Sequence, residues 1–350
     1  MKKTPKPAKN QHWVPRAYLR GWSKNEFIWC FNKQDGTVST PNIKNVSVGA
    51  WFNDLRETRD ESKPEIFQAI EKEFANIEGA ITPILQHLRN EGKRIAECFP
   101  GEPEGLRQLL SPKDCQNLAG FIAMQYLRTD DMREFVRQAY TKFHQRAFDE
   151  TAPIAFPGID ISKYKIELDE NEIKRLHLLM LLQFPELIPL LVDKYWLYDI
   201  NIHDAPLITS DTPITLISNP ANALVSSNGL ASKGVHIVFP LSPNIAVSLY
   251  DKSFFPEHKD SDKQLGFLTK GKVKQYNQLQ LVRCRRQIYS SDNNFEWAKK
   301  LCQEHPEIAV LEFDRYQPFS ATEDKLIEEL IQISKDNPPK LNPFRDSPLN

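Results

Sequence analysis

Apolar residues recur at alternating steps of three and four in the first half of the chain, which is the spacing of amphipathic helices. One such stripe follows Ser62-Lys63-Pro64-Glu65, a capping box with proline in the first helical turn. Its apolar members are Phe67, Ile70, Phe74, Ile77, Ile81, Ile84 and Leu88. Pro83 is expected to kink this helix. Residues 91–110 contain several Gly and Pro residues and predict a loop.

A second long helix is predicted after Ser111-Pro112-Lys113-Asp114, a capped start with an acid near the positive end of the helix dipole. Its inward stripe contains two polar residues one turn apart, and it runs through Leu118, Phe121, Gln125, Arg128, Met132, Phe135 and Ala139. In one interpretation Arg128 extends to water and Gln125 bonds a backbone group. In the other, Arg128 is buried against an anionic partner. The spacing favours neither.

Helical spacing resumes over residues 173–191, and from Lys194 onward the pattern is that of strands. The predicted strands are residues 195–200, 207–209, 214–217, 235–239, 245–249 and 280–289. A helix near 294–303, a strand at 308–313 and a capped helix from Ser320 follow. Near the N-terminus, Asp35-Gly36 between residues 26–32 and 37–40 predicts a hairpin.

These elements predict an α+β fold, with a central region of long helices packed on a mostly antiparallel C-terminal sheet and an N-terminal β-hairpin. Residues 1–9 read as a flexible basic arm, residues 10–334 as a single domain, and residues 335–350 as a flexible proline-rich tail.

Composition narrows the class of protein. The chain of 350 residues has 45 Lys+Arg against 46 Asp+Glu, so nucleic-acid binding would need a local basic patch. The five cysteines include no C-x-x-C pair, which argues against a zinc knuckle and a disulfide framework and suits the cytoplasm. No secretory signal is expected in residues 1–9, and the most apolar run, 176–184, is too short for a membrane span.

Residues 10–23 concentrate one histidine, two arginines, one proline and three large aromatic residues. Proline at the start and Gly21 near the end predict a short helix that presents His12 and Arg16 from its beginning. His12 is a candidate general base, metal ligand or hydrogen-bonding histidine.

Three further positions are candidates for a site. Asp211 lies in Ser210-Asp211-Thr212-Pro213, where proline should hold a fixed bend, although the residues alone favour an Asx or Ser/Thr turn. Arg283 and Arg285 would share one strand face and could contact phosphate, or they could protect a solvated edge strand. His236 reads as a core histidine with a partner.

The motifs of P-loop ATPases, dinucleotide oxidoreductases, zincins and α/β-hydrolases are all missing. Several short motifs taken together resemble the domain-of-unknown-function family 4238 from about residue 10 to residue 291. They are Gln11-His12-Trp13-Val14-Pro15, Tyr18-Leu19, Gln125-Tyr126-Leu127-Arg128-Thr129, Thr209-Ser210-Asp211-Thr212-Pro213, Phe239-Pro240-Leu241-Ser242-Pro243, Asn277, Arg285 and Tyr289-Ser290. Relatives often have proline where this chain has Asp130, so the helix here is expected to continue. The family has no settled activity, but the resemblance favours Gln125, Arg128 and Asp211 as site members.

The leading hypothesis is a nuclease-like or nucleotide-directed phosphoesterase, a possible toxin or phage-defence effector. His12, Gln125, Arg128 and Asp211 are the predicted catalytic residues, and Arg16, Ser210, Arg283 and Arg285 the predicted substrate contacts, for a nucleic acid or nucleotide. A divalent cation is a possible cofactor, with its ligands unknown. Two alternatives stay open: a non-catalytic module that binds an anionic or nucleotide ligand, and a structural protein with a buried polar network. The sequence does not name the oligomeric state.

Overall fold

The structure, a computed structural model, describes residues 9–55, 57, 68–98, 109–217 and 229–310. The chain divides into two compact units. The first unit is Met1–Arg133 with Lys174–Phe313, and the second is Glu134–Ile173 with Asp314–Asn350. The predicted single domain over residues 10–334 stays a prediction.

The first unit is built on a five-stranded sheet in the order β10-β5-β9-β8-β7. Its strands are β5 (Tyr195–Ile200), β7 (Thr215–Ile217), β8 (His236–Ser242), β9 (Ile245–Tyr250) and β10 (Gln264–Phe267). All neighbouring strands are antiparallel except β10, which is parallel to β5. Every residue of β8 and β9 is buried, so both faces of the sheet are covered.

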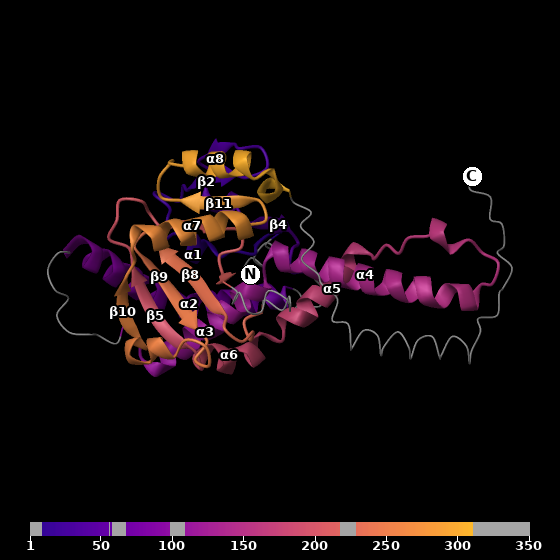
Figure 1. The fold of residues 1–350 in the computed structure, drawn as a ribbon, viewed down its shortest axis with the longest axis horizontal. Coiled ribbons are helices and arrows are strands. Elements are labelled where there is room, and N and C mark those ends of the chain that lie inside the picture. Colours follow the sequence, from indigo (N-terminus) through magenta and orange to yellow (C-terminus); the bar gives the residue numbers. More distant parts are fainter. Residues whose placement is uncertain (1–8, 56, 58–67, 99–108, 218–228, 311–350) are drawn as a thin grey trace, which may run out of the picture. The chain divides into compact units, whose positions relative to one another are not determined.

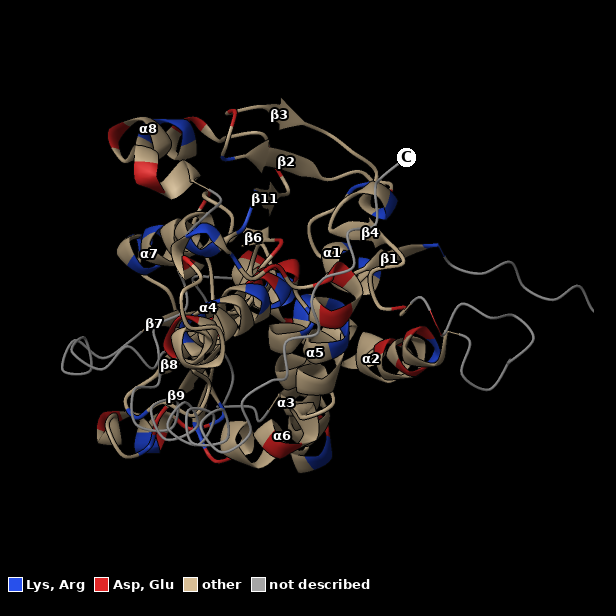
Figure 2. Ribbon diagram, turned by 90° about the vertical axis from the view of Figure 1, so that its right-hand side faces the viewer, with Lys and Arg blue, Asp and Glu red and all other residues tan. Residues whose placement is uncertain are grey.

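Helices cover the two faces of this sheet (Figure 1, Figure 2). On one face lie α2 (Ala69–Cys98) and α3 (Pro112–Leu127), with α6 (Phe184–Val192) against α3. A Cβ atom added at Gly92 of α2 would lie 2.7 Å from the Cβ of Ile245, so only glycine permits this close approach to β9. The other face is covered by α7 (Lys270–Arg283), whose Val273 and Tyr276 are buried.

A second, antiparallel sheet has the order β3-β2-β11-β6 and carries α8 (Glu296–Glu304). Its strands are β2 (Trp29–Asn32), β3 (Val38–Ser39), β6 (Thr209–Ser210) and β11 (Gln287–Ser290). Strands β2 and β3 form the predicted hairpin. A further pair joins β1 (Asn10–His12) to β4 (Val48–Ala50), which places the N-terminal motif beside the turn η1 (Ile43–Asn45).

The second unit contains most of α4 (Asp130–Ala155), the turn η3 (Ile161–Lys163) and the start of α5 (Glu170–Leu181). Both amino groups of Arg137 contact Glu170, at 2.5 and 2.8 Å. Together, Glu170–Val192 are long and apolar enough, by length and composition only, to cross a membrane. Core helices of soluble proteins pass the same test, so this is weak evidence, and the predictions of no membrane and a cytoplasmic location stay predictions.

The α+β class and the mostly antiparallel sheet are confirmed, but four sequence predictions were wrong. Helix α2 continues to Cys98 instead of ending before residue 91, because Gly92 and Ile95 pack inward. The helix breaks at Arg128-Thr129, where the Thr129 hydroxyl accepts from the Met132 N–H and starts α4. Residues 280–289 form the end of α7 and β11, and Pro306–Ala309 form a 3-10 turn.

Four other predictions lie outside the described residues. They are the capping box at 62–65, nearly all of the basic arm, the helix from Ser320 and the tail 335–350.

Candidate functional site

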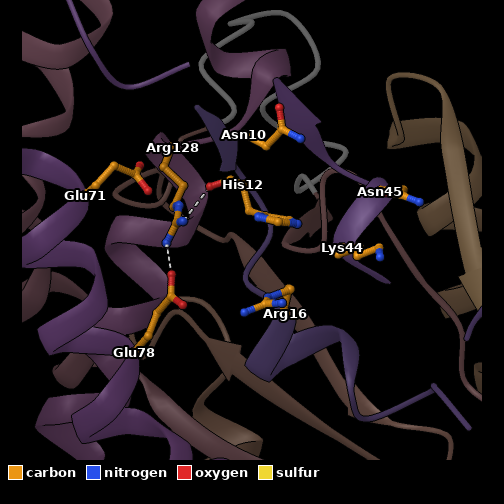
Figure 3. A pocket seen from close by; sticks show the side chains of 8 residues that line it. All are labelled: Asn10, His12, Arg16, Lys44, Asn45, Glu71, Glu78 and Arg128. Carbon is orange, nitrogen blue, oxygen red and sulfur yellow. Dashed lines mark hydrogen bonds and ion pairs between the residues drawn. The ribbon is translucent and has the colours of Figure 1, made fainter. Parts of the chain in front are cut away.

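A pocket of about 470 Å³ opens where β1, η1, α1 (Arg16–Leu19), α2 and the end of α3 meet. Figure 3 shows the eight residues that line it: Asn10, His12, Arg16, Lys44, Asn45, Glu71, Glu78 and Arg128. Three of the predicted site residues, His12, Arg16 and Arg128, therefore lie together in one pocket.

His12 is the last residue of β1 and pairs with Val48, so it comes from a strand and not from the predicted helix. Pro15 has an extended backbone and is the N-cap of α1, which leaves Arg16 as the first helical residue. The His12 Nε2 atom is buried and has no hydrogen-bond partner among the described residues. Burial, and next the charges of Arg16 and Arg128, lower the pKa of His12 to about 4, so the ring is neutral at pH 7.

Arg128 and Gln125 bind two successive backbone carbonyls, those of His12 and Trp13. The Arg128 Nη2 atom donates to the His12 carbonyl at 2.6 Å, and the Gln125 Nε2 atom donates to the Trp13 carbonyl at 2.9 Å. Arg128 is only 2% exposed, pairs with Glu78 at 3.0 Å and lies over the Phe74 ring. Arg128 is thus buried against an anionic partner, as the second interpretation expected. Gln125 bonds a backbone group, as the first interpretation expected.

The opposite face of β1 is fixed by Gln11. Its amide donates to the Asp54 carboxylate at 2.5 Å and accepts from the Asn53 N–H at 2.6 Å. The Asn53 side chain in turn donates to Glu71 Oε1 at 2.5 Å. Gln11 is not among the site residues predicted from the sequence. Neighbouring side chains of a strand point to opposite faces, so the position of Gln11 opposite His12 could have been expected.

Arg89 of α2 anchors α1. Its guanidinium donates to the carbonyls of Leu241, Ala17 and Tyr18 at 2.7, 3.0 and 2.6 Å. A Cβ atom added at Gly21 would lie 2.6 Å from the Leu241 carbonyl, so glycine is required where the chain leaves α1. Arg16 is therefore presented from a helix whose position is fixed, while its own side chain is exposed.

The walls of the pocket also include residues that the sequence did not single out. Lys44 and Asn45 belong to η1 and are exposed. Glu71 and Glu78 lie seven residues apart on α2, which is two helical turns, so both point from one face. Burial raises the pKa of Glu71. In the sequence these positions look like ordinary solvent-exposed helix and turn residues.

Asp211 does not line this pocket. Its buried carboxylate accepts from the backbone N–H groups of Arg285, Arg286 and Gln287 at 2.8, 2.8 and 3.0 Å. Burial raises the pKa of Asp211 to about 6, and the three backbone hydrogen bonds act in the opposite direction. Asp211 thus fixes the connection between α7 and β11, a turn more than 70 residues away in sequence.

Of the predicted substrate contacts, Arg16 lines the pocket, and Ser210, Arg283 and Arg285 do not. Ser210 donates to Gln280 at 2.6 Å, and Arg285 pairs with Asp130 at 2.9 Å. Arg283 is the last residue of α7 and does not share a strand face with Arg285. His236 is buried, as expected, and its ring stacks on Tyr250 with centroids 4.0 Å apart.

Within the described ranges, no group of three or more His, Cys, Asp or Glu side chains is arranged to hold a metal ion. The pocket is instead lined by side chains that can donate hydrogen bonds, those of Arg16, Lys44, Arg128 and two asparagines, together with the neutral His12 ring and two carboxylates. Such a set can bind an anion on one side and accept hydrogen bonds on the other.

Comparison with known proteins gives one match. Residues 10–294 match the profile of a family described as "Protein of unknown function (DUF4238)". No curated protein matches the chain, and no solved structure matches it. Because the profile covers more than half of the sequence, the chain belongs to the DUF4238 family.

Proposed function

We propose that this protein is a nucleotide-directed phosphoesterase whose reaction takes place in the pocket around His12. One observation carries the proposal: the buried Nε2 atom of a neutral histidine has no partner among the described residues, and this histidine lines a pocket together with Arg16 and Lys44. Figure 3 shows the His12 side chain between the Arg128 side of the pocket and the Lys44 side.

The chemistry follows from the donor set. Arg16 and Lys44 neutralise the phosphate oxygens, and the amides of Asn10 and Asn45 add hydrogen bonds. A water oxygen attacks phosphorus while its proton passes to His12 Nε2. The bond from phosphorus to the leaving oxygen breaks, and that oxygen takes a proton from solvent.

The low pKa of His12 makes it a weak base in the empty pocket. Positive charge from Arg16 and Arg128 contributes to that low value. A bound phosphate at Arg16 and Lys44 places negative charge near the His12 ring and so raises the His12 pKa toward the pH at which the enzyme works. The substrate thereby strengthens the base.

Arg128 and Gln125 act as positioning residues in this proposal. Arg128 is already committed to Glu78 and to the His12 carbonyl, so it sets the place of the histidine instead of gripping the substrate. Because Arg128 is bonded to Glu78 and to the His12 carbonyl, the pocket has one group fewer available for catalysis. This favours a second candidate function, a module that binds an anionic nucleotide without cleaving it.

Hydrolysis and binding measured side by side distinguish the two functions. The full chain is tested with bis(p-nitrophenyl) phosphate, mononucleotides and short single-stranded RNA and DNA, with and without Mg²⁺ or Mn²⁺. Calorimetry follows binding of a non-hydrolysable nucleotide. The His12→Asn variant is compared with His305→Asn, since His305 is exposed and lies outside the pocket.

A phosphoesterase loses hydrolysis in His12→Asn and keeps it in His305→Asn. Binding without hydrolysis by the unaltered chain identifies the binding module. If no phosphate-bearing compound is bound or cleaved, both functions are contradicted.

A further inference from the structure

The pocket has two walls of opposite character. In Figure 3, Glu71, Glu78 and Arg128 lie on one side of His12, while Lys44 and Asn45 lie on the other. We call the side formed by Glu71 and Glu78 the acidic wall, and the side formed by Arg16 and Lys44 the basic wall. The acidic wall comes from α2, and the basic wall from the start of α1 and from η1.

The acidic wall is only partly neutralised within the protein. Glu78 pairs through Oε1 with Arg128. Glu71 Oε1 accepts from Asn53, while its Oε2 atom has no hydrogen-bond partner among the described residues. An ionised carboxylate can only accept hydrogen bonds, so a ligand group at Glu71 must donate.

The basic wall imposes the opposite requirement. The ammonium of Lys44 and the guanidinium of Arg16 can only donate, so the ligand group beside them must accept and should be anionic. The ligand therefore carries an anion at one end and N–H donors at the other. A volume of about 470 Å³ lies within the range of pockets that hold molecules of nucleotide size.

We infer that the pocket binds a guanine nucleotide, with its phosphate at the basic wall and the Watson–Crick edge of guanine at Glu71. This inference rests on the proposed function and names its substrate class. Guanine presents two adjacent donors, N1–H and the 2-amino group, which match the two acceptor oxygens of one carboxylate. Burial of Glu71 strengthens this preference, because a buried carboxylate loses more when a donor is missing.

Other bases fit the same carboxylate less well. Adenine and cytosine each offer one amino group next to a ring nitrogen with a lone pair, and that lone pair would face the second carboxylate oxygen. Hypoxanthine keeps N1–H but lacks the 2-amino group. The expected order of affinity is GMP first, IMP next, and AMP and CMP last.

Substitution of Glu71 by glutamine provides a directional test. The amide keeps the length of the side chain and an oxygen for Asn53, but it replaces one acceptor by a donor. A glutamine amide complements the donor-acceptor pair of adenine. Glu71→Gln should therefore lower GMP affinity about tenfold and raise AMP affinity, which reverses the preference. The control is Glu73→Gln, an exposed position two residues along α2.

The experiment is calorimetric titration of the full chain and of both variants with GMP, IMP, AMP and CMP, with inorganic pyrophosphate as the probe for the basic wall. Melting temperatures measured in parallel verify that each variant is folded. GMP preference that reverses in Glu71→Gln and persists in Glu73→Gln supports the inference.

Two results overturn the inference, and they differ in what else they contradict. Equal affinity for all four nucleotides, together with binding of pyrophosphate, refutes guanine recognition and leaves the phosphoesterase proposal in place. Absence of binding by every phosphate-bearing probe refutes both. If Glu71→Gln does not fold, the order of the four affinities in the unaltered chain decides, and a preference for AMP or CMP over GMP refutes the inference.

Discussion

The Arg128 guanidinium donates to the His12 backbone carbonyl at 2.6 Å, across 116 positions of chain. The same guanidinium pairs with Glu78, which lines the pocket with His12. One side chain from the end of α3 therefore fixes the place of the histidine relative to α2. This relationship makes Arg128 a positioning residue with both structural and functional consequences.

Replacement of Arg128 by methionine should destabilise the protein by about 3–5 kcal/mol, because a buried pair is broken and the His12 carbonyl loses its donor. Arg128→Lys should cost less but should still lower nucleotide affinity, since an ammonium cannot reproduce the fork that reaches both partners. Urea unfolding and calorimetry measure the two effects. Arg94→Lys, at an exposed position on α2, is the matched control. Full affinity in Arg128→Lys would show that the geometry of the fork is unimportant.

Replacement of Asp211 by asparagine should destabilise the fold without removing activity. The three backbone N–H groups of residues 285–287 lose their charged acceptor, and one of the two oxygens becomes a donor. The expected loss is about 2–3 kcal/mol of unfolding free energy, since hydrogen bonds to a charged group contribute about 1.5–3 kcal/mol. Urea unfolding and nucleotide titration check this. Loss of activity at unchanged stability would mean that Asp211 takes part in the reaction after all.

The basic wall should bind anions mainly by charge. Lys44→Met should weaken nucleotide binding by up to about tenfold at low salt, and the difference should shrink in high salt because exposed charges are screened. Lys274→Met, an exposed lysine of α7, should have no effect. Titrations at two ionic strengths test the prediction. A weakening that is the same at both strengths would point to a structural effect of Lys44.

The pH dependence follows from the lowered pKa of His12 at about 4. The neutral ring is the active form, so kcat/KM should rise with pH through about 4 and then stay level up to pH 7. The free energy of unfolding should also fall as the pH is lowered. The folded pKa of His12 lies below its unfolded value of about 6.5, so the unfolded state binds more protons as the pH falls from about 6.5 to about 4, and stability is lost over that range. Rate profiles of the unaltered chain check the first point. A rise centred near pH 6.5 would place the base elsewhere.

Sequence periodicity was enough to predict the helices that carry long apolar stripes and the buried strands β5, β8 and β9. It failed at α7, where Lys, Gln and Asn residues hide the spacing of Val273 and Tyr276. It also failed at Gly92, where the sequence predicts a loop. This glycine is part of α2 and allows the helix to approach β9 closely. In both places tertiary contacts decide, and the local pattern does not contain them.

The candidate site was predictable only in part. His12 and Arg16 were selected from residue type and position, and Arg128 with the help of the family resemblance, and the three share the pocket. Glu71 and Lys44 were not, because a glutamate on a helix and a lysine in a turn can be assigned to a site only once β1 is seen to bring η1 and α2 together. Asp211 shows the converse, since a carboxylate next to hydroxyl groups can satisfy backbone groups far away in sequence instead of binding a ligand.

The central claim, that the His12 pocket binds a phosphate-bearing anion, is tested most directly by NMR titration of the His12 imidazole with and without a non-hydrolysable nucleotide. We predict a His12 pKa of about 4 in the free protein and a rise of at least one unit on binding. A nucleotide that binds without moving the His12 resonance or its titration would contradict the claim.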